Sequence, residues 1–204
     1  MEAVLYIHGK GGNARESEHY RSLFPAAAVL GLEYRTFTPW ETGGEIREAA
    51  EGIAARHGRI TLIANSIGAY FSLSAGIDRL IRKAYFISPI LDMEKLISGI
   101  MVQAGVTEKE LEAKGRIHTS FGEELSWAYL RWIREHPIRW EAPTEILYGS
   151  LDTLTSRETA ETFARIHGAG LTVMEGGEHW FHTETQLAFL DAWIREKERE
   201  ETTC

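Results

Sequence analysis

Cysteine is nearly absent from this sequence, because the only one is Cys204 at the last position. A lone cysteine excludes an intrachain disulfide framework and is typical of a reducing compartment, and a thiol at the chain end is a poor nucleophile candidate. Long apolar runs are also missing, since no stretch approaches the roughly 18 consecutive apolar residues of a membrane span. The sequence therefore predicts no membrane span.

Positive charge is in deficit as well. Lysine and arginine together number 22 against 30 acidic residues, a formal net charge of −8, which disfavours nucleic acid and anionic membrane surfaces as partners. The opening residues "MEAVLYIHGKGG" lack a basic leader, so we expect no signal peptide and a cytoplasmic location. At 204 residues, 44% hydrophobic and 25% charged, the sequence predicts one globular domain.

Short apolar runs alternate with longer amphipathic ones, which predicts a mostly parallel six-stranded sheet flanked by helices. We expect strands over residues 3–7, 33–37, 59–64, 83–87, 145–148 and 171–174. We expect helices over residues 17–30, 44–57, 67–76, 156–167 and 183–198. Most of the expected strands are apolar along their length, as is typical of strands with both faces covered.

The interval from about residue 92 to 140 breaks this alternation. It contains no convincing strand and at least two helical patterns, over residues 107–114 and 123–135. The first begins with a capping box, in which Thr107 and Glu110 satisfy each other's backbone N–H groups. The interval therefore predicts a helical cap inserted into a single domain.

Polar features follow four of the expected strands. They are "HGKGGN" from His8, "NSIG" from Asn65, "GSLD" from Gly149 and "GGEH" from Gly176. In an open parallel sheet, ligands bind outside the carboxyl ends of the strands, so we expect these four segments to converge on one rim.

These motifs resemble the α/β-hydrolase superfamily in its small single-domain form. The resemblance rests on "YIHGKGG", "IANSIGA", "LYGSLD" and "GGEHWFH", which occur in the family's order of serine, acid and histidine. It covers essentially the whole chain and implies a three-layer fold with a cap insertion. It also implies a serine hydrolase with Ser66 as nucleophile, Asp152 as acid and His179 as general base.

Ser66 has a simpler interpretation as the N-cap of the following helix. That interpretation does not account for the small residues Ala64 and Gly68, which a strained strand-to-helix turn requires. The family pattern has glycine where this sequence has Ala64, a mild departure. The N-terminus of the helix that begins near Ile67 favours the negative charge that develops during nucleophilic attack.

By the same resemblance, the backbone N–H groups of Lys10 and Ile67 form the oxyanion hole, and His8 orients the glycine-rich loop. A phosphate-binding loop is the rival interpretation of "HGKGGN", but the Walker spacing is absent. Two alternatives remain open: His182 competes with His179 as the base, and Asp92 competes with Asp152 as the acid.

Six tryptophans are many for this length. The candidates for lining an acyl or aryl pocket are Trp40, Trp127 and Trp180. Packing in the core is the commoner role for any single one of them. The sequence thus predicts an esterase-like serine hydrolase of small-molecule acyl substrates with no metal or organic cofactor. The same triad also suits thioesters, peptides or acyl transfer, and a non-catalytic binding protein on this scaffold is the rival from another class. The sequence carries no prediction of oligomeric state.

Overall fold

The computed structural model describes residues 2–202, and Cys204 lies outside them. The chain forms two compact units. The first runs up to Leu91 and resumes at Arg139, and the second comprises Asp92–Ile138. No helix among the described residues is long and apolar enough to cross a membrane.

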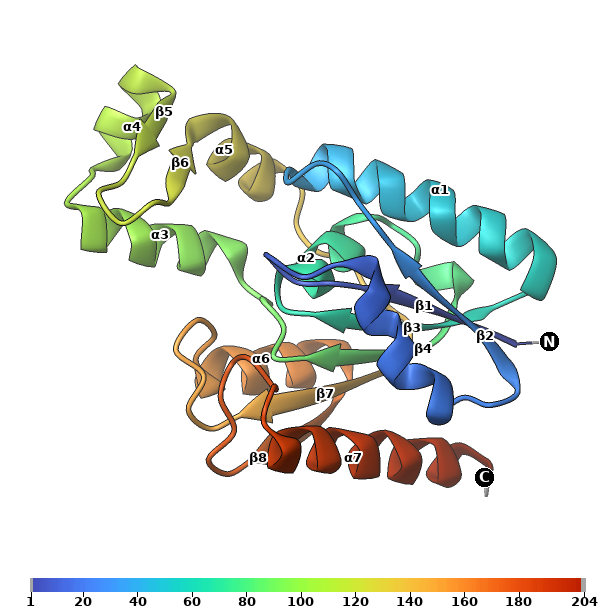
Figure 1. The fold of residues 1–204 in the computed structure, drawn as a ribbon. Helices are drawn as coiled ribbons and strands as arrows, with labels where there is room; N and C mark the ends of the chain where they lie inside the picture. The colour runs from blue at the N-terminus through green and yellow to red at the C-terminus, as the bar shows by residue number, and fades with distance from the viewer. Residues whose placement is uncertain (1, 203–204) are drawn as a thin grey trace. The chain divides into compact units, whose positions relative to one another are not determined.

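The first unit is built on a six-stranded sheet whose neighbouring strands are all parallel (Figure 1). Its strands, in the order β2-β1-β3-β4-β7-β8, confirm the predicted parallel sheet. They are β1 (Glu2–Ile7), β2 (Ala27–Leu32), β3 (Ile60–Asn65), β4 (Ile81–Ile87), β7 (Thr144–Gly149) and β8 (Gly170–Met174).

Helices cover both faces of this sheet. On one face, Tyr6, Ile63 and Tyr85 share a buried core with Tyr20 of η1 (Ala14–Ser22) and Leu190 of α7 (Glu184–Thr202). On the other face lie α1 (Pro39–His57), α2 (Ile67–Ser74) and α6 (Arg157–His167), and a short turn, η2 (Asp78–Leu80), leads into β4. The result is the three-layer arrangement expected from the sequence.

The second strand lies earlier in the chain than predicted. The sequence predicted a helix over 17–30, but only residues 17–22 are helical, as part of the 3-10 helix η1, and β2 takes up its last residues. The strand predicted over 33–37 was wrong, because these residues form neither helix nor strand. Alanine and leucine favour a helix there, but Pro25 lacks the N–H that a helix interior needs. Gly31 lets β2 approach η1, because a Cβ atom at Gly31 would overlap the carbonyl of Ala14. Packing at the sheet edge therefore overrides helix propensity.

The second unit contains a β-hairpin that the sequence did not predict. Its strands have three residues each, too few for an alternating pattern to be recognised, and the Thr119 N–H donates to the Glu123 carbonyl (2.8 Å) to close the turn. The two predicted helices are present, although the second begins at Trp127 rather than at residue 123, and a third helix precedes them. The elements are α3 (Met93–Ala104), α4 (Glu108–Lys114), β5 (Arg116–His118), β6 (Glu124–Ser126) and α5 (Trp127–Glu135). The role of this insertion as a cap stays a prediction.

Candidate active site

Ser66 occupies the turn between β3 and α2 in a backbone conformation that L-residues rarely adopt. Its φ is 49° and its ψ is −121°, and Ser88 is the only other non-glycine residue with positive φ in the described part of the chain. Such a conformation costs about 1–3 kcal/mol and persists where the surrounding structure enforces it. The Ser66 side chain makes no capping hydrogen bond to α2. The hydroxyl is therefore available for something other than capping.

Small residues let the loop after β1 pack directly on this turn. A Cβ atom at Gly68 would overlap the His8 carbonyl oxygen, and a Cβ atom at Gly9 would lie 3.1 Å from the Cβ atom of Ser66. Ala64, at the other small position, is completely buried. The loop and the turn are thus fitted to each other at backbone level.

Gly68→Ala should therefore lower both stability and activity. The added methyl group forces the His8 carbonyl or the start of α2 to move, which should destabilise the fold by about 1–3 kcal/mol. The matched control is Gly52→Ala in α1, where an added Cβ meets no atom within 4 Å. The melting temperature and kcat are measured for both variants and compared with those of the wild type. A Gly68→Ala protein as stable and active as Gly52→Ala would contradict this packing argument.

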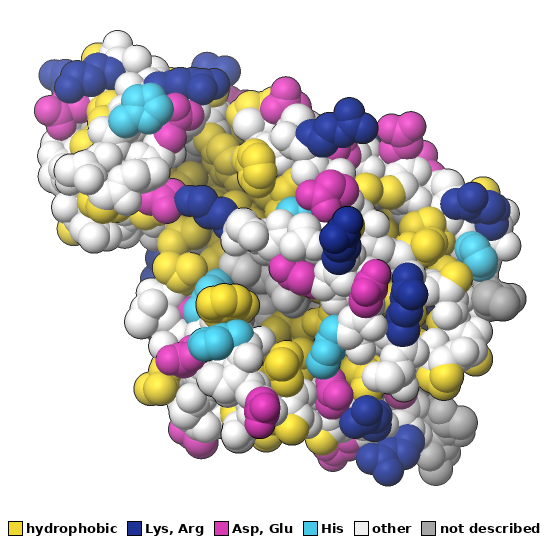
Figure 2. All heavy atoms as spheres, in the orientation of Figure 1, with side chains coloured by type: hydrophobic (Ala, Val, Ile, Leu, Met, Phe, Trp, Pro, Cys, Tyr) yellow, Lys and Arg dark blue, Asp and Glu magenta, His cyan; other side chains and the backbone are white. Residues whose placement is uncertain are grey.

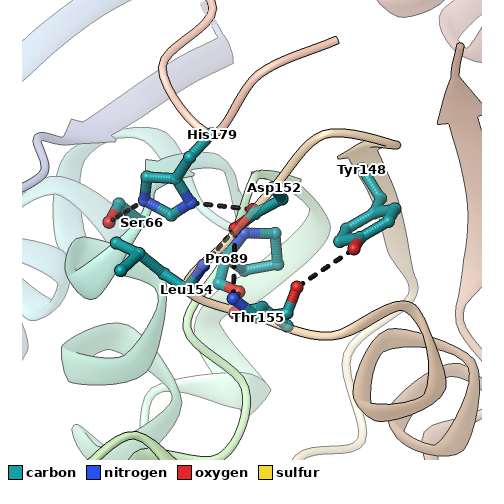
Figure 3. A network of polar contacts seen from close by, with 7 residues as sticks. All are labelled: Ser66, Pro89, Tyr148, Asp152, Leu154, Thr155 and His179. Atoms are coloured by element: carbon teal, nitrogen blue, oxygen red, sulfur yellow. Dashed lines mark hydrogen bonds and ion pairs between the residues drawn. The ribbon is translucent and has the colours of Figure 1, made fainter. Parts of the chain in front are cut away.

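His179 lies between Ser66 and Asp152 (Figure 3). Its Nδ1 atom is 2.7 Å from Oδ2 of Asp152, and its Nε2 atom is 2.8 Å from Oγ of Ser66. An ionised carboxylate only accepts hydrogen bonds, so Nδ1 carries the proton and Nε2 presents a lone pair to the serine hydroxyl. The Asp152 side chain is fully buried and His179 is 20% exposed. The histidine is thus oriented to take the proton of Ser66.

Asp152 is itself held by its own turn. Its Oδ1 atom accepts from the backbone N–H groups of Leu154 (2.8 Å) and Thr155 (3.1 Å), and the Thr155 carbonyl accepts from the Tyr148 hydroxyl (3.0 Å; Figure 3). Burial, together with the negative charge of Asp152, raises the pKa of Tyr148, which keeps that hydroxyl a donor. One carboxylate oxygen thus stabilises the turn while the other faces His179.

The two rival residues have other partners. Asp92 is the N-cap of α3, where its side chain accepts from the Lys95 N–H (2.9 Å). His182 is exposed, its Nδ1 atom lies 2.7 Å from the Trp180 carbonyl, and its ring stacks on that of Trp180 at 4.5 Å between centroids. The geometry therefore favours Asp152 and His179 over these two residues.

The glycine-rich loop after β1 is fixed by hydrogen bonds to one carbonyl. The Gly9 oxygen accepts from the Gly12 N–H (3.1 Å) and lies 2.8 Å from Nδ1 of His8. The peptide bond between Gly9 and Lys10 is trans, so the Lys10 N–H points to the side opposite that oxygen. His8 is buried and stacks on Tyr34 at 4.1 Å. This arrangement fits the predicted orienting role of His8.

A cavity of about 610 Å³ opens beside Ser66 and His179 within the first unit. Its walls come from the loop of Gly9 to Gly12, from η1, from the ends of β3 and β4, and from α7. Figure 2 shows hydrophobic and histidine side chains around a hollow on this face. Lys10 and Trp180 line the cavity, and Ile67 directly follows Ser66. Among the residues that the structure describes, Trp40 is not part of the lining of this cavity. Trp127 belongs to the second unit.

The sequence matches no family model and no curated protein. The structure, in contrast, is similar to solved structures along nearly its whole length. Est1E from Butyrivibrio proteoclasticus is 17% identical, with a TM-score of 0.75 over 100% of this chain and 89% of that chain. The alpha/beta hydrolase domain-containing protein 10 from mouse is 17% identical, with a TM-score of 0.71 over 97% of this chain and 90% of that chain.

A third similar structure is XC6422 from Xanthomonas campestris, described as an α/β serine hydrolase without lid. It is 14% identical, with a TM-score of 0.66 over 97% of this chain and 81% of that chain. The chain has the α/β-hydrolase fold. The fold places the carboxyl ends of β3, β7 and β8 at one edge, which is why residues 27 and 113 positions apart in the sequence meet at His179.

Several polar residues in the cavity wall of this α/β-hydrolase fold were not predicted from the sequence. The Tyr6 hydroxyl donates to Glu16 and accepts from Asn65, and His19 pairs with Asp191 at 2.7 Å. The one available signal was the spacing of Asn13 and Glu16, which form a capping box at the start of η1. The others give no signal in the sequence, because their partners are distant along the chain.

Proposed function

We propose that the protein is a serine hydrolase that cleaves carboxylic esters of small molecules through an acyl-enzyme. The observation that carries this proposal is the hydrogen-bond chain from Asp152 through His179 to Ser66. The strained turn at Ser66 supports it, because a residue that only caps a helix has no need of that conformation.

In the first step, the Ser66 oxygen attacks the ester carbonyl carbon while its proton passes to Nε2 of His179. The carbonyl π electrons move to oxygen, and the backbone N–H groups of Lys10 and Ile67 stabilise the resulting oxyanion. In enzymes of this type, each such donor contributes about 2.7–4 kcal/mol to the transition state. The Asp152 carboxylate stabilises the imidazolium that forms.

In the second step, the oxyanion collapses and the bond from carbon to the alcohol oxygen breaks. The His179 imidazolium gives its proton to the departing alcohol, and the acyl group stays on Ser66. Water then enters, loses a proton to His179 and attacks the acyl carbon. Collapse of this second intermediate releases the carboxylic acid and returns the proton to Ser66.

The cavity supports a small, largely apolar substrate. Its volume of about 610 Å³ falls within the range of small-molecule sites, and its apolar walls include Phe181, Leu187 and Leu190. We propose that Trp180, whose side chain is 73% exposed, contacts the acyl or aryl group. Contacts from Trp40 and Trp127 stay predictions, as does the cytoplasmic location. The net charge of −8 disfavours bulky polyanionic thioesters.

Asp152→Asn should lower kcat for p-nitrophenyl butyrate by about 10³–10⁴-fold. The asparagine oxygen can still accept from the Leu154 and Thr155 N–H groups, so the turn survives. Its NH₂ group would then face Nδ1 of His179, which forces the ring proton onto Nε2 and leaves no acceptor for Ser66.

The matched control is Asp92→Asn, in which the new side chain still caps α3. We expect this variant to keep kcat within about twofold. Steady-state kinetics of the two variants decide between the two acids. A large loss in Asp92→Asn with normal turnover in Asp152→Asn would reverse the assignment.

A further inference from the structure

Three side chains in the cavity wall, those of Glu16, Tyr6 and Asn65, form a continuous hydrogen-bonded link. The Tyr6 hydroxyl, on a fully buried residue of β1, donates to Oε2 of Glu16 on η1 at 2.5 Å. The Tyr6 oxygen in turn accepts from Nδ2 of Asn65, the last residue of β3, at 3.0 Å. All three residues line the cavity that also contains Ser66.

The direction of each donation follows from the chemistry of the groups. An ionised carboxylate has no proton to give, so the Tyr6 hydroxyl must be the donor to Glu16. Burial, the neighbouring Tyr20 and the hydrogen bond to Glu16 all raise the pKa of Tyr6, which keeps the phenol protonated. With its proton committed, the Tyr6 oxygen can only accept from Asn65, and this sets the orientation of the amide.

The two ends of this link lie in or beside the two segments that contain the proposed oxyanion-hole donors, Lys10 and Ile67. At one end, Oε1 of Glu16 accepts from the Asn13 N–H (3.2 Å) and lies against Gly12, where an added Cβ would be 2.7 Å from that oxygen. Gly12 ends the loop that contains Lys10. At the other end, Asn65 directly precedes Ser66 and Ile67.

The stability of the core alone does not explain why this hydrogen-bonded link is present. Phenylalanine at position 6 would bury the same ring without a hydroxyl to satisfy. The Oδ1 atom of Asn65 is buried with no hydrogen-bond partner among the described residues, which is unfavourable for folding. Buried polar groups that are retained at such a cost are found preferentially at functional sites.

We propose that Tyr6 is a positioning residue, which with Glu16 and Asn65 fixes the separation of the Lys10 and Ile67 N–H groups. This inference rests on the proposed hydrolase function and deepens it. The oxyanion hole needs both donors within about 2.7–3.1 Å of one developing charge. A shift of about 1 Å between loop and turn costs about 10²-fold in rate. Loss of the link of Glu16, Tyr6 and Asn65 should therefore weaken stabilisation of the transition state and leave substrate binding unchanged.

The test compares Tyr6→Phe with Tyr85→Phe. Tyr85 is also fully buried in the same core, and its hydroxyl also donates to a carboxylate, that of Glu198 at 2.6 Å. Each variant loses one buried hydroxyl, but that of Tyr85 donates to α7, whereas that of Tyr6 lies between Glu16 and Asn65. The measurements are kcat and KM for p-nitrophenyl butyrate, Ki for an alkyl trifluoromethyl ketone, which forms a tetrahedral adduct, and the melting temperature.

We expect Tyr6→Phe to lower kcat by about 10- to 100-fold, to raise Ki by a similar factor and to leave KM within about twofold. Tyr85→Phe should keep kcat and Ki within about twofold. Equal kcat and Ki in the two variants would overturn the proposal. A loss in Tyr6→Phe that falls on KM alone would overturn it as well.

Substitutions at Glu16 give a second route that leaves the core unchanged, because this side chain is exposed. Glu16→Gln keeps an acceptor oxygen for Tyr6 and should lose less activity than Glu16→Leu, which should match Tyr6→Phe. Equal activity in the two variants would count against the link. If wild type hydrolyses the ester and Tyr6→Phe does so equally well, only the positioning role fails. If wild type neither turns over esters nor reacts with a fluorophosphonate, the proposed function fails with it.

Discussion

Replacing Ser66 by alanine should lower kcat for p-nitrophenyl esters by at least about 10⁴-fold. The variant keeps the Cβ atom and the backbone of the turn but loses the oxygen that lies 2.8 Å from His179. No nucleophile then remains, and only weak stabilisation of water attack by the oxyanion hole is left. Because the hydroxyl makes no capping hydrogen bond, the melting temperature should change by only about 2 °C.

Ser88→Ala is the matched control for this prediction. Ser88 is the other serine with positive φ (41°), its side chain is buried, and its Oγ atom has no hydrogen-bond partner among the described residues. We expect its loss to keep kcat within about threefold. Steady-state kinetics and thermal melts of both alanine variants make the comparison. A Ser66→Ala protein that retains a tenth of wild-type activity would rule out Ser66 as the nucleophile.

His179→Ala should be nearly as damaging, with a loss in kcat of at least about 10⁴-fold. Without the imidazole, the Ser66 proton has no acceptor and the leaving alcohol has no donor. The buried Asp152 carboxylate also loses its partner, although its bonds to the Leu154 and Thr155 N–H groups remain. The fold should therefore survive the substitution.

His182→Ala is the control, and it should keep kcat within about threefold. This ring stacks on Trp180 and bonds to a backbone carbonyl, so its loss removes local packing at the cavity rim. Kinetics of the two variants under identical conditions provide the measurement. Severe loss in His182→Ala with near-normal turnover in His179→Ala would transfer the role of general base to His182.

The main features of the sheet could be predicted because each central strand is a short apolar run that ends in a polar motif. The motifs at Ser66, Asp152 and His179 each follow such a run, so their meeting at one edge follows from parallel strands alone. The exposed edge gave no such signal. β2 is only half-buried, and its alanine-rich sequence favours a helix until packing on η1 is taken into account.

The link of Tyr6, Glu16 and Asn65 could not be predicted, because each residue has a simpler interpretation in isolation. Tyr6 is one more aromatic in an apolar strand, Glu16 belongs to a capping box, and Asn65 ends a strand. Their sequence separations are 10 and 59 residues, so only the folded sheet brings them within hydrogen-bonding distance. The hairpin of the second unit was not predicted for a different reason, because its strands are too short to show an alternating pattern of apolar and polar residues.

The most direct measurement of the central claim is labelling with a fluorophosphonate, followed by intact-mass spectrometry of wild type and Ser66→Ala. An activated serine beside an open cavity should displace fluoride and gain one phosphonyl group. We expect a single adduct on wild type and none on Ser66→Ala, with Ser88→Ala labelled like wild type. A folded wild-type protein that gains no adduct, or an adduct that persists in Ser66→Ala, would contradict the assignment of Ser66 as the nucleophile of a hydrolase.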